Sequence, residues 1–268
     1  MAIMERRVTL KSAAQIERMA RAGRLVSDVL DRVGEAIRPG VTTLELDALA
    51  EGLVRGAGAT PSFVGVPGHR QPYRHTLCVS IDDEVVHGVP GPRRINEGQI
   101  VSVDAGAIVE GWHGDAARTW IVGEVPGPVR ELVEATERAM YAGIAAARPG
   151  NHISDISAAI EDVAIARGYG VVRQFVGHGI GTEMHEEPQV TNYRSGHRGR
   201  RLEPGLCLAI EPMFTLGGHE VEVQPDGWTV VTRDGRLAAH WEHSIAIAAD
   251  GPRILTQGAD SVAGEAVG

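Results

Sequence analysis

Two histidines, His178 and His185, lie seven residues apart in the segment 176–188, which reads VGHGIGTEMHEEP. A helical zinc-protease motif needs its histidines four residues apart on one face. The glycines and the proline of this segment exclude such a helix. The pair could bind a metal ion, act as an acid and a base, or belong to an ordinary loop, and the rest of the chain has to decide among these possibilities.

Bulk composition narrows the class of protein. The 268 residues suffice for one large domain or two small ones with a substantial core. The net charge of −9 argues against a protein that grips nucleic acid through its phosphates. Cys78 and Cys207 show no paired spacing, which favours a reducing compartment. Without a signal peptide or a long apolar run, the sequence predicts a cytoplasmic protein that does not enter a membrane.

An internal repeat organises the chain. Residues 37–51, IRPGVTTLELDALAE, resemble residues 147–161, ARPGNHISDISAAIE, at an offset of 110. A helical pattern precedes each of them, over 14–36 and 128–147. Each second helix runs into glycines, as helix C-termini commonly do. Both copies therefore predict a helix, an Arg-Pro-Gly turn and a second helix.

Strand-like segments after each helix pair continue the repeat. Three further pairs resemble each other in the same order: 84–90 and 175–181, 97–107 and 203–213, and 113–122 and 240–248. We predict two α+β halves, about 13–123 and 128–250, packed with pseudo-twofold symmetry into a single domain over 13–256. Helices followed by runs of strands favour an antiparallel sheet with the helices on one side. Residues 1–12 form an N-terminal segment, and we predict a disordered tail over 257–268.

The repeat matches acidic residues across the two halves. It places Asp104 opposite Glu211, Asp115 opposite Glu242, and His87 opposite His178. Asp104 and Glu211 are each expected to end an apolar strand, where a buried carboxylate is costly unless a positive charge neutralises it. No lysine follows Lys11, so the counter-charge must be a metal ion or an arginine, with three nearby candidates: Arg118, Arg173 and Arg233.

Several carboxylates and a histidine that converge across a pseudo-twofold axis fit a site for two divalent ions of the Mn, Fe, Co or Zn type. Taken singly, Asp104 could be a turn residue, Glu211 could end a strand in a salt bridge, and His178 could satisfy a backbone carbonyl. Those readings require independent accidents at matched positions in both halves. The two-metal hypothesis is therefore the stronger one.

The motifs together carry a resemblance. SVDAGAIVEGWHGDAART, GHGIGTEMHEEP, IEPMF and WEHSIAI occur in this order, and over about residues 10–250 the chain resembles the type I methionine aminopeptidases. The resemblance implies the pseudo-twofold "pita-bread" fold, a curved antiparallel sheet with two helix pairs on its outer face. It implies two divalent ions (Co, Mn, Fe, Ni or Zn) and these ligands: Asp104, Asp115, His178, Glu211 and Glu242.

The same resemblance assigns roles to the two opening histidines. His178 corresponds to the histidine ligand, and His185 to a residue that hydrogen-bonds the scissile amide. His87 corresponds to a second histidine beside the substrate, and Glu211 to the group that takes the proton of the attacking water. The implied reaction is metal-assisted removal of methionine from nascent polypeptides, with a small second residue favoured. The enzyme would act as a monomer, at or near the ribosome, without binding nucleic acid.

Specificity depends on a pocket for the methionine side chain. The family has an aromatic and glycine-rich stretch before Cys78, which here reads PSFVGVPGHRQPYRHTLC. The candidates for the pocket walls are Phe63, Tyr73, Cys78, Met184 and Trp228. The family often has asparagine where Asp82 stands, in a loop that can bind an auxiliary cation.

Two alternatives use the same fold. Xaa-Pro aminopeptidases and dipeptidases resemble it and use similar ligands, but they usually carry a sizeable additional N-terminal domain. Non-catalytic relatives act as binding proteins and typically lose metal ligands, whereas this chain keeps all five. The sequence favours the methionine aminopeptidase over both.

Overall fold

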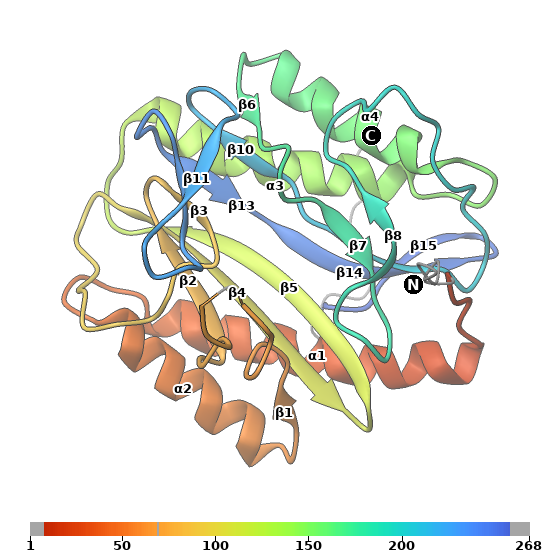
Figure 1. Ribbon diagram of the computed structural model, residues 1–268, viewed down its shortest axis with the longest axis horizontal. Coiled ribbons are helices and arrows are strands. Elements are labelled where there is room, and N and C mark those ends of the chain that lie inside the picture. Colours follow the sequence, from red (N-terminus) through yellow and green to blue (C-terminus); the bar gives the residue numbers. More distant parts are fainter. Residues whose placement is uncertain (1–7, 69, 258–268) are drawn as a thin grey trace.

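The computed structural model describes residues 8–68 and 70–257, and its two halves repeat one plan (Figure 1). The helices are α1 (Ala13–Ala36), α2 (Thr43–Gly56), α3 (Gly127–Ala146) and α4 (Ile153–Ile165). The strands of the first half are β1 (Thr60–Pro61), β2 (Leu77–Ile81), β3 (Glu84–Val86), β4 (Ile100–Val109) and β5 (Trp112–Ile121). Those of the second half are β6 (Gly170–Val171), β7 (Gly177–Gly179), β8 (Glu186–Val190), β9 (Cys207–Ile210), β10 (Met213–Thr215), β11 (Val221–Val223), β12 (Val230–Thr232), β13 (Ala238–His240), β14 (Glu242–Ala248) and β15 (Gly251–Ile254).

Local sequence signals explain where the helices begin. Ser12 caps α1 and Thr42 caps α2, each in a capping box closed by the third helical residue, Gln15 or Glu45. The two Arg-Pro-Gly turns adopt the same conformation, since Gly40 has a φ of 92° and Gly150 a φ of 93°. The predicted helix–turn–helix repeat is confirmed in both halves.

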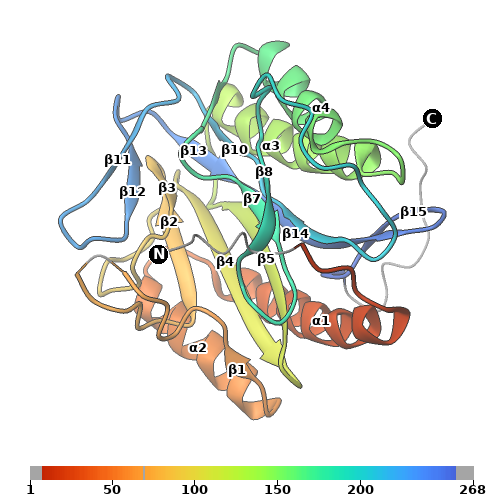
Figure 2. The same ribbon diagram turned by 45° about the vertical axis from the view of Figure 1, so that its right-hand side comes forward.

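One large antiparallel sheet joins the two halves. Its strand order is β1-β4-β5-β14-β9-β7-β8, with β2 also paired to β4 and β15 to β14. Two small three-stranded sheets, β13-β10-β6 and β11-β12-β3, complete the fold. Figures 1 and 2 show the α1/α2 pair along one part of the sheet and the α3/α4 pair along the other. The predicted α+β class with a curved antiparallel sheet is confirmed.

The two faces of β5 differ in character. Ala116 points into the core beneath α1 and α2, whereas Asp115 faces the opposite side. A Cβ atom at Gly114 would lie 2.6 Å from the backbone nitrogen of Gly23, so the α1 backbone rests directly on the strand. The helices therefore cover one face, and the other face is left for polar side chains.

The predicted boundaries at the two ends of the domain stay predictions. The predicted tail falls almost wholly on 258–268, which lie outside the described residues. The described part of the N-terminal segment docks on the second half, where the Lys11 amide donates to the Gly205 carbonyl at 2.7 Å. In the part of the chain that the structure describes, no helix is both long and apolar enough to cross a membrane.

Candidate metal centre and active site

The floor of the site is built on neighbouring strands of the large sheet. Asp104 lies in the middle of β4, opposite Cys78 on one side and Ala117 on the other. The expectation that Asp104 ends a strand is wrong. Gly106, two residues on, serves close packing, because a Cβ atom there would lie 2.8 Å from the side chain of Ser62.

Asp115 and Glu242 meet where the two halves join. Glu242 pairs with Ala117 across the β5–β14 seam, which leaves Asp115 level with Ser244. The Ser244 hydroxyl donates to the Asp115 carbonyl at 2.7 Å and accepts from its amide at 3.2 Å. Asp115 and Glu242, which the sequence repeat matches, therefore lie close together on adjacent strands of the seam.

The turns before β4 and β9 agree with the match of Asp104 with Glu211. The Gly98 amide donates to the Val122 carbonyl at 2.7 Å, and the Gly205 amide donates to the Ile247 carbonyl at 2.9 Å. Each carboxylate follows its glycine by six residues, although Glu211 lies past the end of β9 and Asp104 lies inside β4. β7 pairs with β9 as β2 pairs with β4, so β7 is the counterpart of β2.

The match of His87 with His178 is accordingly wrong. His87 follows β3, which belongs to a small sheet, whereas His178 lies in β7 of the large sheet. His-Gly-aliphatic motifs in both halves suggested the pairing, but a short motif carries no information about which strand it joins.

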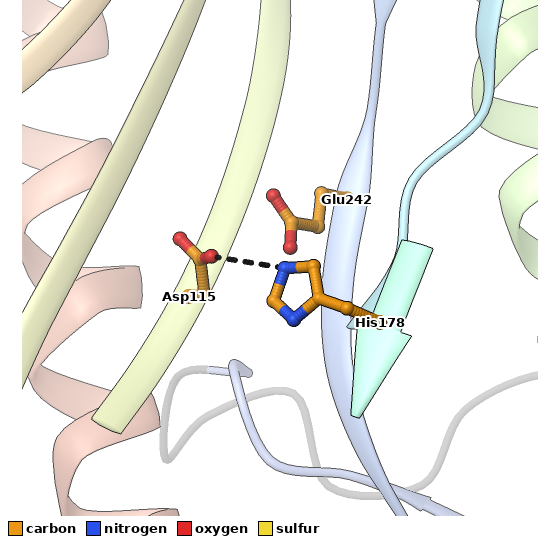
Figure 3. Close-up of side chains that lie close together, drawn as sticks. All are labelled: Asp115, His178 and Glu242. Carbon is orange, nitrogen blue, oxygen red and sulfur yellow. Dashed lines mark ion pairs between the residues drawn. The ribbon is translucent and has the colours of Figure 1, made fainter. Parts of the chain in front are cut away.

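His178 presents a nitrogen lone pair to the carboxylates. Its Nδ1 lies 2.9 Å from the Gly179 carbonyl, to which it can donate only as N–H, so Nε2 is left unprotonated in the neutral ring. Nε2 lies 3.5 Å from Glu211 Oε1 and 3.9 Å from Asp115 Oδ2, as Figure 3 shows for the second contact. Burial lowers the pKa of His178 to about 3, which keeps the ring neutral. The backbone contact and the ligand role coexist, because they use different nitrogens.

The carboxylates of the floor are buried without a cationic side chain. Among the described residues no lysine or arginine forms an ion pair with any of them. The proposed arginine partners are wrong: Arg118 binds Asp31, Arg173 stacks on Tyr193, and Arg233 pairs with Glu220. Each of these contacts lies outside the pocket, so the counter-charge has to come from elsewhere.

The pKa values of the buried carboxylates indicate that the site lacks a positive charge. Burial raises the pKa of Asp104 to about 7. Burial, together with neighbouring carboxylates, also raises the pKa values of Asp115, Glu211 and Glu242 well above their usual range. Three oxygens of these carboxylates have no hydrogen-bond partner among the described residues: Asp104 Oδ1, Asp115 Oδ1 and Glu242 Oε1. Unpartnered buried oxygens beside a deprotonated imidazole nitrogen fit a divalent cation.

Distances between donors agree with that fit. Asp115, His178 and Glu242 each offer one donor atom, and these three atoms lie within 4.8 Å of one another (Figure 3). Two donors bound to one ion at about 2.1 Å each can be at most about 4.2 Å apart. The His178 contacts of 3.5 and 3.9 Å fall inside that span and outside hydrogen-bonding range. The arrangement can hold a metal ion after small side-chain adjustments.

A hollow of about 130 Å³ joins this floor to apolar walls. Its lining contains every site residue predicted from the sequence: Phe63, Tyr73, Cys78, His87, Asp104, Asp115, His178, Met184, His185, Glu211, Trp228 and Glu242. Four of them form one apolar cluster, Phe63, Tyr73, Cys78 and Met184. Tyr73 holds its place by donating from its hydroxyl to the Leu77 carbonyl at 2.9 Å and by an edge contact with the Trp228 ring at 4.9 Å.

His87 and His185 line this hollow and also a second one of about 330 Å³. The His185 ring lies 4.5 Å from that of His178, and the His87 ring packs edge-on against Phe175 at 5.3 Å. His87 has a φ of 59°, an uncommon backbone conformation that turns its side chain toward the hollows. Burial lowers the pKa of His87 to about 4, so its ring is neutral at pH 7.

The sequence reasoning missed two residues of the site. Val66 lines the first hollow, within the long stretch before Cys78. His240 is buried, and its Nε2, which has no hydrogen-bond partner, lies 3.8 Å from Glu211 Oε2. The signal for His240 was present, since the repeat matches the segments that begin at His113 and His240. Glu211 is thus flanked by an imidazole at each oxygen.

The loop that holds Asp82 uses this carboxylate internally. Asp82 Oδ2 accepts from the Gln99 side chain at 2.8 Å, and Oδ1 accepts from the Ile100 amide at 3.1 Å. Asp82 itself has a φ of 60°. The side chain therefore closes the turn before β3.

Comparison with known proteins agrees with this geometry. The family described as metallopeptidase family M24 matches residues 17–249. The methionine aminopeptidase of Clostridium acetobutylicum is 46% identical over 93% of this chain and 98% of its own. A crystal structure of methionine aminopeptidase from Thermotoga maritima superposes with a TM-score of 0.90 at 40% identity, over 94% of this chain and all of that one.

A more distant likeness bears on the Xaa-Pro alternative. The Xaa-Pro dipeptidase of Bacillus anthracis superposes with a TM-score of 0.75 at 24% identity, over 92% of this chain but 62% of that one. At that identity only the fold is shared, whereas the methionine aminopeptidases match along their whole length. The chain belongs to metallopeptidase family M24 and, within it, to the methionine aminopeptidases.

Proposed function

We propose that this chain removes the N-terminal methionine from nascent proteins and peptides and favours a small second residue. The observation that carries the proposal is the first hollow, where an apolar cluster able to hold an unbranched side chain adjoins a carboxylate and histidine floor. The methionine side chain would pack among Phe63, Met184 and Trp228, which places the first peptide bond over the floor. The relatives that match over their whole length carry the same activity in their names.

The proposed ligands for two divalent ions are Asp104, Asp115, His178, Glu211 and Glu242. Asp115 and Glu242 would hold the ions from the two adjacent strands of the seam between the halves. When bound, the ions supply Lewis-acid polarisation of the peptide carbonyl and lower the pKa of water. Co, Mn, Fe, Ni or Zn suits this donor set.

Glu211 is the proposed proton carrier. It lies past the end of β9 and is partly open to the hollow, with a side-chain exposure of 13%. Burial raises its pKa, which favours acceptance of a proton from water and its later transfer to the departing amine. The neutral His178 and His240 rings on either side restrict the orientation of its carboxylate.

His87 and His185 are the proposed contacts to the substrate backbone. Because the His87 ring is neutral at pH 7, it acts as a hydrogen-bonding group and adds no charge to the site. His185 would donate to the carbonyl oxygen as negative charge develops there. Both residues also line the second hollow, which offers space for the polypeptide beyond the cleaved bond.

The cellular setting is part of the proposal. Nascent chains are the substrate, so the enzyme would work as a monomer in the cytoplasm, close to the ribosome. The two free, buried cysteines are consistent with a reducing compartment.

A peptide assay tests the function. Met-Ala-Ser should be cleaved, Met-Leu-Ser more slowly, and an Ala-Pro peptide not at all. A chelator should abolish cleavage, and Mn, Co or Fe should restore it. Cleavage of Ala-Pro in preference to Met-Ala would instead support the Xaa-Pro alternative, full activity after metal removal would contradict the metal mechanism, and metal binding without any cleavage would indicate a binding protein.

A further inference from the structure

Lys11 is the single lysine among the 268 residues, and it is buried, with 7% of its surface exposed. Its Nζ lies 2.5 Å from Glu186 Oε2, with the two side chains 4% and 11% exposed. Thr9 completes the contact: its hydroxyl accepts from Lys11 Nζ at 2.7 Å and donates to Glu186 Oε2 at 2.8 Å. The segment before α1 is thereby tied to the start of β8 by a buried, hydrogen-bonded ion pair.

The second oxygen of Glu186 organises the loop between β7 and β8. Oε1 accepts from the Thr182 amide at 3.0 Å and from the Glu183 amide at 3.4 Å. A Cβ atom at Gly181 would lie 2.3 Å from Glu186 Oε1 and 2.6 Å from Lys11 Cε. The loop backbone is therefore wrapped around the ion pair, with no room for a side chain at Gly181.

This loop carries two residues of the proposed active site. Met184 belongs to the apolar cluster of the first hollow, and His185 stands against the His178 ring. Lys11 itself lines neither hollow. Any effect of Lys11 on the reaction must therefore pass through the loop from Gly181 to Glu186.

The energetics of a buried ion pair favour a geometric role for Lys11 over a purely stabilising one. A buried ion pair contributes little net stability, because desolvation offsets the attraction between the charges. Loss of one partner, however, leaves an unpaired charge under the loop, and the loop must then move to let water reach it. The cost appears as displacement of Met184 and His185.

We propose that Lys11 is a positioning residue of the active site, which through Glu186 holds the loop that presents Met184 and His185. The inference rests on the proposed function, in which His185 supports developing charge on the carbonyl oxygen. The geometry of the catalytic site would then depend on the segment from Thr9 to Lys11.

The test uses Lys11→Met in the full-length, metal-loaded enzyme with Met-Ala-Ser as substrate. We expect kcat to fall about 10- to 100-fold, less than for complete loss of one oxyanion donor. Metal content should stay unchanged, because His178 lies outside the loop. Lys11→Arg, which keeps a cation, should recover most of kcat. A folded, metal-loaded Lys11→Met enzyme with unchanged kcat and KM would overturn the proposal.

A double variant asks whether Lys11 acts through His185. If it does, adding Lys11→Met to His185→Ala should lower kcat little further, since coupled residues are not additive. Independent, multiplied losses would overturn the proposed route. Arg253→Met is the matched control: it removes an exposed ion pair with Glu17 on α1, far from both hollows, and should leave kcat unchanged.

Hydrogen exchange provides a readout that needs no activity. In Lys11→Met the Thr182 and Glu183 amides should exchange faster, while those of β9 and β14 keep their protection. If the wild type cleaves no methionyl peptide but the loop amides respond in this way, the proposed function fails and the positioning role stands. Unchanged exchange in the loop would contradict the positioning role itself. Should Lys11→Met not fold, Lys11→Met/Glu186→Gln removes both charges and is expected to fold with the same loss of kcat; wild-type kcat in that variant would equally overturn the proposal.

Discussion

The two halves of the sheet repeat one plan but contribute unequally to the proposed metal site. The first half offers two carboxylates, Asp104 and Asp115, from the middle of two ten-residue strands. The second half offers His178, Glu211 and Glu242 from shorter strands and from a strand end. β7 carries His178, whereas its counterpart β2 carries no residue of the proposed ligand set. A duplicated framework has thus been kept while the chemistry on matching strands diverged.

Irregularity in the second half explains the difference. β9 ends at Ile210, and Pro212 then lacks the amide that a continued ladder would need. Glu211 is released from the sheet and can move a proton, whereas Asp104 stays fixed by strands on both sides. The regular half supplies fixed charge, and the irregular half supplies the group expected to react.

The largest effect should come from Asp115 and Glu242, the carboxylates at the seam. Asp115→Asn and Glu242→Gln each remove a charge from the seam, and both should abolish cleavage of Met-Ala-Ser and lower the bound metal to the same extent. Metal analysis of the purified variants beside activity measures this. If one variant keeps its metal and the other loses it, the two carboxylates do not share one role, although the sequence repeat matches them.

The second comparison sets His178 on β7 against Cys78 on β2, the matching strand of the first half. His178→Ala should lose bound metal and most activity, because a nitrogen donor is gone. Cys78→Ser should keep its metal and shift mainly KM for methionyl peptides, because Cys78 belongs to the apolar cluster. Burial raises the pKa of the Cys78 thiol, which disfavours the thiolate form that binds metals. Loss of metal from Cys78→Ser would show that the halves are more alike than proposed.

The next prediction distinguishes His185 and His87, which would lie beside the ions, from His178, which would bind one. His185→Ala should keep its metals and lose turnover, on the order of 10²–10³-fold, as for one oxyanion donor. His87→Ala should behave in the same way, although a His-Gly motif makes it look like His178. Metal stoichiometry and kinetics on both variants decide this. Metal loss on substitution of His185 would reverse the assignment of the two opening histidines.

The smallest effect concerns pH in the metal-free protein. Burial raises the pKa of Asp104 to about 7, above its value in the unfolded chain. A raised carboxyl pKa stabilises the fold at low pH, and that contribution is lost as the pH rises through about 7. The free energy of unfolding of the metal-free protein should therefore fall between about pH 4 and pH 7, and added metal should oppose the fall. Urea unfolding at several pH values, with and without Mn²⁺, measures it; Asp104→Asn should flatten the metal-free curve.

Much of this organisation was predictable because it is encoded locally. The helices follow from periodicity and from caps such as Ser12, and the repeated Arg-Pro-Gly turns gave the two halves. The residues that line the first hollow were found because their motifs occur in the family order.

What could not be predicted depends on strand pairing and long-range contact. Nothing in the local sequence shows that β7, and not β3, occupies the place of β2, so His87 was matched to the wrong residue. Asp104 could be taken for a turn residue because its strand partners, Cys78 and Ala117, are not adjacent to it in the sequence. Lys11 stood out only as the last lysine, and its partner Glu186 is 175 residues distant. Identifying His240 as a site residue likewise required knowledge of strand pairing and long-range contact.

Because the proposed donors are divided between the halves, bound ions would hold the two halves together. Any ion held by Asp115 and Glu242 together ties residues 13–123 to residues 128–250, so its binding free energy also resists their separation. At a free ion concentration of 100 times Kd this linkage amounts to about 2.7 kcal/mol. The connection between the halves is a short, largely exposed stretch from Gly123 to Gly127. Cleavage of the chain in this stretch would give two fragments whose reassembly depends on the concentration of free metal. This fold is therefore a natural starting point for an ion-dependent split enzyme.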